Sequence, residues 1–172
     1  MTAEPRKILV LGGARSGKTR HALHLAERTA GPLAYLATAE ARDGEMRERI
    51  ARHRAERGPR WRTVEEPLDL VGAIGRHADA EGAVLVDCLT LWLGNLMEAG
   101  LDAQAEGRHL AESLSALPGR ILLVSNEVGL GIVPDNALAR RFRDEAGRLH
   151  QALAARADHV VFMVAGLPMT VK

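Results

Sequence analysis

The octapeptide GGARSGKT at positions 12–19 directly follows the apolar run ILVL at positions 8–11 and precedes a helical pattern. It matches the motif G-x-x-x-x-G-K-[ST], in which glycines let backbone N–H groups point at phosphate oxygens at the start of a helix. Lys18 then reaches the β- and γ-phosphates, and the Thr19 hydroxyl can coordinate Mg²⁺. The motif therefore predicts binding of a nucleoside triphosphate. The alternative is a glycine-rich turn between a strand and a helix.

Short apolar runs alternate with longer helical patterns along the rest of the chain. Apolar runs of this length are typical of parallel strands that are covered on both faces. The predicted strands are 8–11, 33–37, 83–87, 121–125 and 159–164, and the predicted helices are 18–30, 43–57, 67–79, 88–98, 103–116 and 136–156. This alternation predicts one α/β domain over residues 1–172: a doubly wound, mostly parallel sheet of the P-loop NTPase type with helices on both faces.

Composition excludes several classes of protein. The chain has 172 residues, 23 basic and 22 acidic, and 3% aromatic residues, which argues against a nucleic-acid-binding surface. Its single cysteine, Cys88, excludes an internal disulfide and a zinc site built from cysteines. We expect no membrane span, because no segment reaches about 20 apolar residues. A cytoplasmic location is the expectation that follows.

Asp87 closes the predicted strand 83–87. Nucleotide-binding α/β proteins place a Mg²⁺-holding carboxylate at such a strand end. An aspartate in this position can also simply cap the next helix.

The segment 43–57 combines a histidine with many arginines. At 100° per residue, Met46, Ile50 and His53 share one helical face, so we expect His53 to point inward. The surrounding positive charge disfavours imidazolium and attracts polyphosphate, and a neutral imidazole is a nucleophile. The same spacing also fits a buried core histidine beside a solvated arginine face.

Several blocks together resemble a known family. They are the phosphate loop, YLAT at 35–38, the stretch 43–53, WRTVE at 61–65 and SNEVGLGIVP at 125–134. In this order they are similar to the bifunctional adenosylcobinamide kinase and adenosylcobinamide-phosphate guanylyltransferase family of cobalamin biosynthesis. The resemblance implies two reactions in one domain: phosphorylation of adenosylcobinamide with ATP or GTP, then transfer of GMP from GTP to adenosylcobinamide phosphate.

The resemblance also implies residue roles. His53 corresponds to the guanylylated histidine, so the catalytic residues are expected to be His53, Lys18 and Asp87, with Mg²⁺ held by Thr19 and Asp87. Relatives often have Glu at position 87. The expected nucleotide contacts are Leu11, Gly12, Gly13, Ala14, Arg15, Ser16, Gly17, Lys18, Thr19, Ala37, Thr38, Ala39, Arg54, Ala55, Glu56, Arg57, Glu65 and Asp87.

Glu65 is expected to accept hydrogen bonds from guanine, a pairing that adenine cannot make. The alternative is a surface carboxylate paired with Arg62. The stretch 129–134 is interpreted as an active-site loop. Its glycines and proline also fit an ordinary turn. The other histidines are interpreted as structural or solvated because they lack metal-ligand spacing; they are His21, His24, His77, His109, His150 and His159.

The apolar segment 91–97 indicates either a subunit interface or burial within the domain. Members of the resembled family form trimers, so the resemblance implies a homo-oligomer. Two rival functions remain open at this point. One is a simple small-molecule kinase without nucleotidyl transfer, and the other is a nucleotide-switched module whose arginine-rich helix docks RNA or another partner.

Overall fold

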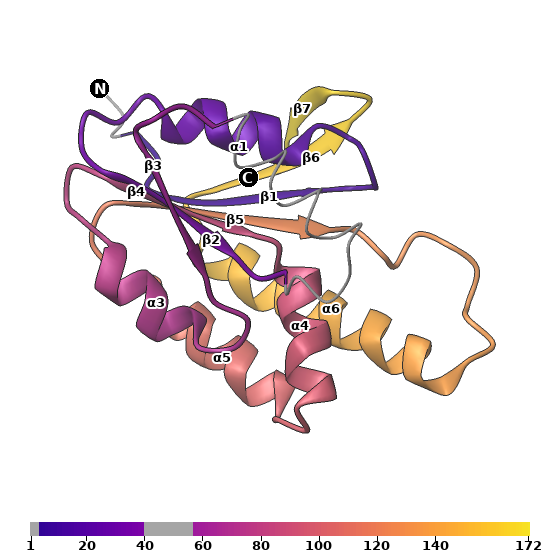
Figure 1. The fold of residues 1–172 in the computed structure, drawn as a ribbon. Helices are drawn as coiled ribbons and strands as arrows, with labels where there is room; N and C mark the ends of the chain where they lie inside the picture. Colours follow the sequence, from indigo (N-terminus) through magenta and orange to yellow (C-terminus); the bar gives the residue numbers. More distant parts are fainter. Residues whose placement is uncertain (1–3, 40–56) are drawn as a thin grey trace.

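Residues 4–39 and 57–172 are described by the computed structural model, and a seven-stranded sheet lies at their centre (Figure 1). The strand order is β3-β2-β4-β5-β1-β6-β7. All neighbours pair in parallel except β6 and β7, which are antiparallel. The strands are β1 (Lys7–Gly12), β2 (Leu33–Ala37), β3 (Trp61–Glu65), β4 (Ala83–Asp87), β5 (Arg120–Asn126), β6 (His159–Val164) and β7 (Leu167–Thr170).

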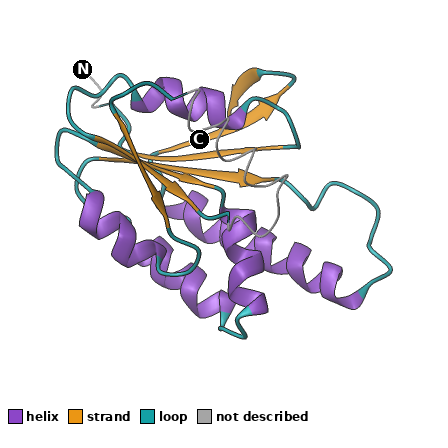
Figure 2. Ribbon diagram, viewed as in Figure 1, coloured by secondary structure: helices purple, strands orange, loops and turns teal. Residues whose placement is uncertain are grey.

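Helices cover both faces of this sheet (Figure 2). On one face lies α1 (Lys18–Ala26), and on the other lie α3 (Leu70–His77), α4 (Leu89–Glu98), α5 (Ala103–Ser113) and α6 (Ala137–Arg156). Two buried apolar clusters result, one between the sheet and α1 and one between the sheet and α3 to α6. The predicted α/β class and the parallel, doubly covered sheet are therefore confirmed.

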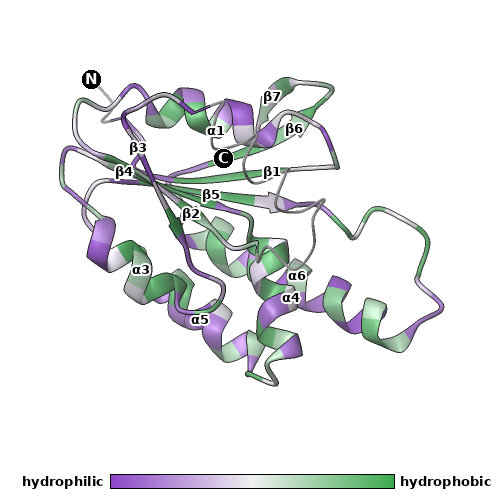
Figure 3. Ribbon diagram, in the orientation of Figure 1, coloured by the Kyte–Doolittle hydropathy of each residue, from purple (hydrophilic) through white to green (hydrophobic). Residues whose placement is uncertain are grey.

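The central strands are apolar because both of their faces are buried. Every residue of β2 is buried, and so are the first four residues of β4. Figure 3 shows the same contrast, since β2 and β4 are mainly hydrophobic and the edge strand β3 is mainly hydrophilic. Sequence reasoning did not predict β3, because the polar residues of WRTVE do not form an apolar run. It also missed β7, whose four residues are all exposed.

Short polar side chains begin three of the helices. Asp69 accepts a hydrogen bond from the backbone N–H of Gly72 and caps α3. Asp102 caps α5 and Asn136 caps α6 in the same way, each through two N–H groups. Such caps satisfy donors that have no partner within the helix. The predicted starts of these three helices, at 67, 103 and 136, lie within three residues of the observed starts.

Burial explains the apolar segment of α4. Trp92, Leu93 and Leu96 are each 1% exposed and pack in the cluster below the sheet, while Leu91 faces outward. The Trp92 indole N–H also donates to the backbone carbonyl of Leu68 at 2.8 Å. Among the described residues, no helix is both long enough and apolar enough to span a membrane.

Candidate functional site at the carboxyl edge of the sheet

The phosphate loop joins β1 to α1 and needs glycine at its two ends. Gly12 and Gly17 have φ angles of 150° and 91°, which L side chains rarely adopt. A Cβ atom on Gly12 would lie 2.7 Å from the Met163 carbonyl oxygen and 2.7 Å from Ser16 Oγ. The loop also rests on the β6–β7 turn, because the Gly166 N–H donates to the Ser16 carbonyl at 3.1 Å. The chain therefore adopts the bent loop that the motif predicted.

Two polar side chains of the loop are buried. Lys18 is 7% exposed, and its ammonium group donates to the Gly13 carbonyl oxygen at 2.6 Å. Burial lowers the pKa of Lys18, and the nearby Asp87 carboxylate opposes that shift. Ser16 Oγ is buried and has no hydrogen-bond partner among the described residues. A buried hydroxyl without a partner is costly, and an anionic oxygen would accept its hydrogen bond. The loop therefore fits a phosphate group.

Asp87 faces Thr19 across the carboxyl edge of the sheet. The Thr19 hydroxyl donates to Asp87 Oδ2 at 2.8 Å, although the two residues are 68 positions apart in the sequence. A hydroxyl and a carboxylate are the oxygen donors that Mg²⁺ prefers. The pair therefore fits this ion. The capping alternative for Asp87 is not what the structure shows, because Cys88 occupies the N-cap position of α4.

Tyr35 is the residue of this site that sequence reasoning missed. Its hydroxyl donates to the same oxygen, Asp87 Oδ2, at 2.6 Å. Burial, together with the Asp87 carboxylate, raises the pKa of Tyr35 above its ordinary range, so the hydroxyl keeps its proton. A tyrosine in an apolar strand gives no sequence signal for this role. Only the parallel pairing of β2 with β4 brings the two side chains together.

Thr38 joins the ends of β2 and β4. Its hydroxyl donates to the Cys88 carbonyl at 2.8 Å and accepts from the Cys88 N–H at 2.8 Å. The Thr38 side chain is fully buried, while Ala39 is half-buried at the edge. The predicted nucleotide contacts at 37–39 therefore lie beside Asp87. The Thr38 hydroxyl already makes two hydrogen bonds to the backbone of Cys88.

Glu65 closes β3 and pairs in register with Ala37. Side chains three positions apart on a strand point to opposite faces, so Arg62 and Glu65 cannot pair. The alternative that paired them is therefore wrong. Glu65 is exposed and shares its sheet face with Thr63.

Arg57 lies above the ring of Tyr35, with its guanidinium carbon 3.6 Å from the ring centroid. It also donates to the Thr63 hydroxyl at 3.0 Å. Residues 40–56 lie outside the described part of the chain, so the predicted nucleophile His53 and the predicted contacts Arg54, Ala55 and Glu56 lie outside it too. Of the predicted helix at 43–57, only Arg57 is described, and it sits in a bend.

The end of β5 contributes a second polar group. His150 of α6 is buried, and its Nε2 lies 2.7 Å from Ser125 Oγ, while its Nδ1 lies 3.9 Å from Glu127 Oε2. Glu127 in turn donates its backbone N–H to the Gly12 carbonyl at 3.0 Å. Burial lowers the pKa of His150, and Glu127 opposes the shift. The segment that leaves β5 therefore starts beside the phosphate loop.

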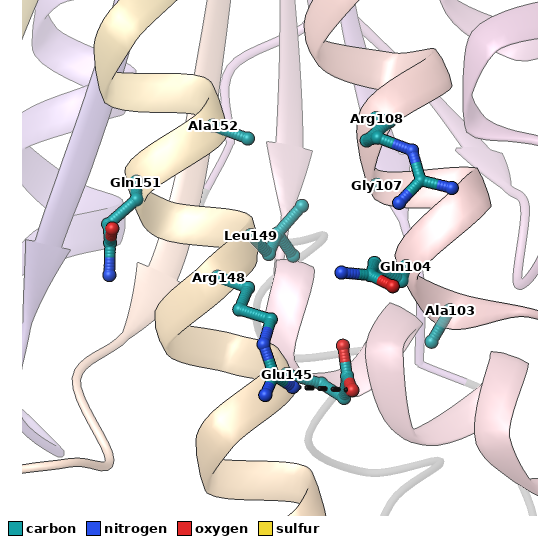
Figure 4. Close-up of a pocket in the computed structure, with 9 residues that line it drawn as sticks. All are labelled: Ala103, Gln104, Gly107, Arg108, Glu145, Arg148, Leu149, Gln151 and Ala152. Carbon is teal, nitrogen blue, oxygen red and sulfur yellow. Dashed lines mark hydrogen bonds and ion pairs between the residues drawn. The ribbon is translucent and has the colours of Figure 1, made fainter.

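A cavity of about 240 Å³ lies elsewhere, between α5 and α6 (Figure 4). Gly107 and Leu149 line it, together with Glu145 and Arg148, which form an ion pair at 2.8 Å. None of the residues predicted for nucleotide binding borders this cavity. The polar edge formed by the ends of β1, β2, β4 and β5 therefore remains the candidate site.

Comparison with known proteins decides the family. Residues 8–171 match the family described as cobinamide kinase / cobinamide phosphate guanyltransferase. The chain belongs to this family. It is 55% identical to the bifunctional adenosylcobalamin biosynthesis protein CobP of Pseudomonas aeruginosa, over 95% of this chain and 96% of that protein. It is 40% identical to the protein CobU of Escherichia coli, which carries the same description, over 96% of this chain and 99% of that protein. The chain is thus a bifunctional enzyme of cobalamin biosynthesis, a cobinamide kinase and cobinamide-phosphate guanylyltransferase.

A similar fold is found in a solved ATPase structure. An ATPase of the type III secretion system of pathogenic bacteria superposes with a TM-score of 0.57 at 11% identity, over 96% of this chain and 56% of that one. This similarity concerns the fold alone, and it agrees with the P-loop class that the sequence predicted.

Proposed function

We propose that both activities use the carboxyl edge of the sheet, with the triphosphate bound by the loop 12–19. The observation that carries this proposal is the hydrogen bond from Thr19 to Asp87, whose carboxylate also interacts with the buried charge of Lys18, together with the buried Ser16 hydroxyl that has no partner among the described residues. Lys18 holds the β- and γ-phosphate oxygens as phosphoryl transfer proceeds. Thr19 and Asp87 hold Mg²⁺, which neutralises charge on the phosphates when bound.

In the kinase reaction, the hydroxyl of the cobinamide side chain attacks the γ-phosphorus and displaces the nucleoside diphosphate. The work of the chain here is positioning and charge stabilisation. The acceptor is adenosylcobinamide, and both ATP and GTP are candidates for the phosphoryl donor.

In the guanylyl transfer, a neutral nitrogen of His53 attacks the α-phosphorus of GTP. A nitrogen–phosphorus bond forms as the bond to pyrophosphate breaks, and an oxygen of cobinamide phosphate then displaces the histidine. Two displacements predict retention of configuration at phosphorus. Arg54 to Arg57 and Glu65 contact the nucleotide, and the exposed carboxylate of Glu65 accepts from guanine. Because α-attack needs a different placement from γ-attack, we expect either the 43–57 segment or the triphosphate to move between the reactions.

The test is a covalent label. The protein is incubated with GTP labelled at the α-phosphate and then denatured. We expect label that is lost in acid and stable in base, absent from His53→Asn and present in His109→Asn, a matched control in which an exposed histidine of α5 is changed. His53→Asn should still form cobinamide phosphate. An unlabelled wild-type protein would contradict the covalent route through His53.

The expected homo-oligomer, a trimer, is part of the proposal. Strongly exposed aliphatic side chains after β5 support it, since Leu130 is 82% and Ile132 is 98% exposed. Light scattering on the purified protein at several concentrations gives the mass that decides this point. A cytoplasmic location stays a prediction from the sequence.

A further inference from the structure

Two hydroxyl groups converge on a single carboxylate oxygen at the candidate site. Asp87 Oδ2 accepts from Thr19 Oγ1 of α1 at 2.8 Å and from the Tyr35 hydroxyl of β2 at 2.6 Å. Two elements, α1 and β2, therefore fix the direction of a carboxylate that a third element, β4, carries. A side chain with two free torsion angles loses that freedom when two donors hold the same oxygen.

The two donors differ in what else they can do. Thr19 is an expected metal ligand, so its hydroxyl oxygen serves the cation when nucleotide is bound. Tyr35 is 4% exposed and lies beneath Arg57, away from solvent. Its hydroxyl is therefore the donor that can hold Asp87 in place whether or not Thr19 is engaged with a metal.

The ring of Tyr35 is itself fixed by its neighbours. The Arg57 guanidinium covers one face at 3.6 Å, and Trp61 approaches at 6.2 Å between centroids with the ring planes 82° apart. These contacts would serve phenylalanine equally well, since none of them uses the hydroxyl. A buried hydroxyl costs desolvation unless it has a partner, and the partner here is Asp87. The hydroxyl of Tyr35 therefore serves its hydrogen bond to Asp87 and is not needed for the packing of the core.

We propose that Tyr35 is a positioning residue that holds the Asp87 carboxylate in the orientation required to bind the Mg²⁺ of the nucleotide. This inference rests on the proposed role of Asp87 as a metal ligand. It assigns to a core tyrosine a function in both reactions, because each uses a triphosphate at this edge. Partners that orient metal ligands typically change metal affinity by 10- to 100-fold when removed.

The experiment measures binding of a non-hydrolysable ATP analogue, adenylyl imidodiphosphate, by equilibrium dialysis in excess EDTA and in excess Mg²⁺. The ratio of the two dissociation constants gives the contribution of the metal. In Tyr35→Phe we expect the dissociation constant in EDTA to stay within about twofold of wild type. The constant in Mg²⁺ should rise by about tenfold.

A matched control is Thr63→Val. This variant removes a hydroxyl from the neighbouring strand on the same sheet face and deletes the Arg57 hydrogen bond, but it leaves the Tyr35–Asp87 contact intact. It should keep the wild-type ratio. Thermal unfolding of each variant is followed in parallel, because a purely structural hydroxyl would lower the melting temperature without changing the ratio of the two constants. An unchanged ratio in Tyr35→Phe would overturn the inference.

Asp87→Asn separates this inference from the proposed function. If Asp87→Asn loses the Mg²⁺ contribution and Tyr35→Phe keeps it, Asp87 is a ligand that does not need Tyr35, and only the inference is wrong. If Asp87→Asn binds the analogue as wild type does in Mg²⁺, the ligand role of Asp87 is wrong and the inference fails with it. Loss in both variants supports both.

Discussion

The two ends of the parallel strands use buried charge in opposite ways. At the amino edge, the Lys7 ammonium group donates to the carbonyl oxygens of Leu117 and Gly119, at 2.7 and 2.9 Å. Arg120 on the same edge pairs with Glu4 and donates to the Leu25 carbonyl. These cations hold parts of the chain together.

At the carboxyl edge, the polar groups contact one another and leave capacity unused. Among the described residues, Lys18 has a single carbonyl partner, Asp87 accepts from two hydroxyls, and Ser16 Oγ has no partner. A buried polar group whose hydrogen bonds are all made to the backbone stabilises the fold. A polar group that still has hydrogen bonds to make can bind a ligand. Substitutions at the two edges should therefore separate stability from activity.

The largest effect is expected for Lys18→Ala at the carboxyl edge. In the proposed function Lys18 stabilises the transferring phosphoryl group, so removing its charge should lower kcat/KM of the kinase reaction by roughly 10²–10³-fold. The free energy of unfolding should change little, because one contact to Gly13 is lost. Kinase assays and urea unfolding check both statements. Arg28→Ala, at an exposed position just after α1, should keep wild-type activity. A kcat/KM within fivefold of wild type in Lys18→Ala would contradict a role of the loop 12–19 in phosphoryl transfer.

The next effect is expected for Lys7→Met at the amino edge. The buried carbonyl of Gly119 and the partly buried carbonyl of Leu117 would lose their donor, which should lower the free energy of unfolding by about 1–3 kcal/mol. The kinase kcat should stay within twofold at a temperature where the variant is folded. Arg6→Met, at an exposed neighbour, serves as the control in the same urea titration. Lost activity at unchanged stability would contradict the division between the edges.

Thr38 lies at the carboxyl edge, but its hydroxyl is hydrogen-bonded to the backbone, as the cations of the amino edge are. A substitution of Thr38 therefore tests whether these backbone contacts or the position at the edge decides the effect. Thr38→Val leaves the Cys88 N–H and carbonyl without their side-chain partner. We expect a loss of about 1–3 kcal/mol in unfolding free energy and, because Asp87 precedes Cys88, a lower kcat as well. Thr38→Ser keeps the hydroxyl and should restore both quantities. A variant with normal stability and a weakened nucleotide affinity would make Thr38 a direct nucleotide contact instead.

The smallest effect is a pH dependence from His150. Burial lowers the pKa of His150, so between its ordinary value near 6.5 and its lower folded value the unfolded chain binds a proton that the folded chain does not. The free energy of unfolding should therefore fall as the pH drops below about 6.5, by at most about 1.4 kcal/mol per unit of pKa difference. Urea unfolding at pH 7.5, 6.5 and 5.5 measures the slope. His150→Gln should flatten it, although His21 and His77, whose pKa values burial also lowers, leave a remainder. If the free energy of unfolding of His150→Gln depends on pH as steeply as that of wild type, the pH dependence comes from other groups.

The sequence by itself determined the phosphate loop, the apolar strands and the family. Each of these is a local pattern: a glycine spacing, a continuous buried run, or a block of adjacent residues, and each can be read without knowing its neighbours in space. The edge strand β3 escaped because it is exposed on one side and carries polar residues there. The last residue of β3 is nevertheless Glu65, which pairs in register with Ala37, a predicted nucleotide contact.

Only the tertiary structure decided how the site is held. Tyr35 and Asp87 are 52 positions apart, and Ser125 and His150 are 25 apart, so no spacing rule connects them. Parallel pairing sets β2 beside β4, and helix α1 packs against β4, which brings two hydroxyl groups to one carboxylate. The direction of a polar side chain depends on the partners that the fold supplies, because a hydrogen bond needs its two atoms within about 3 Å and the sequence does not contain that distance.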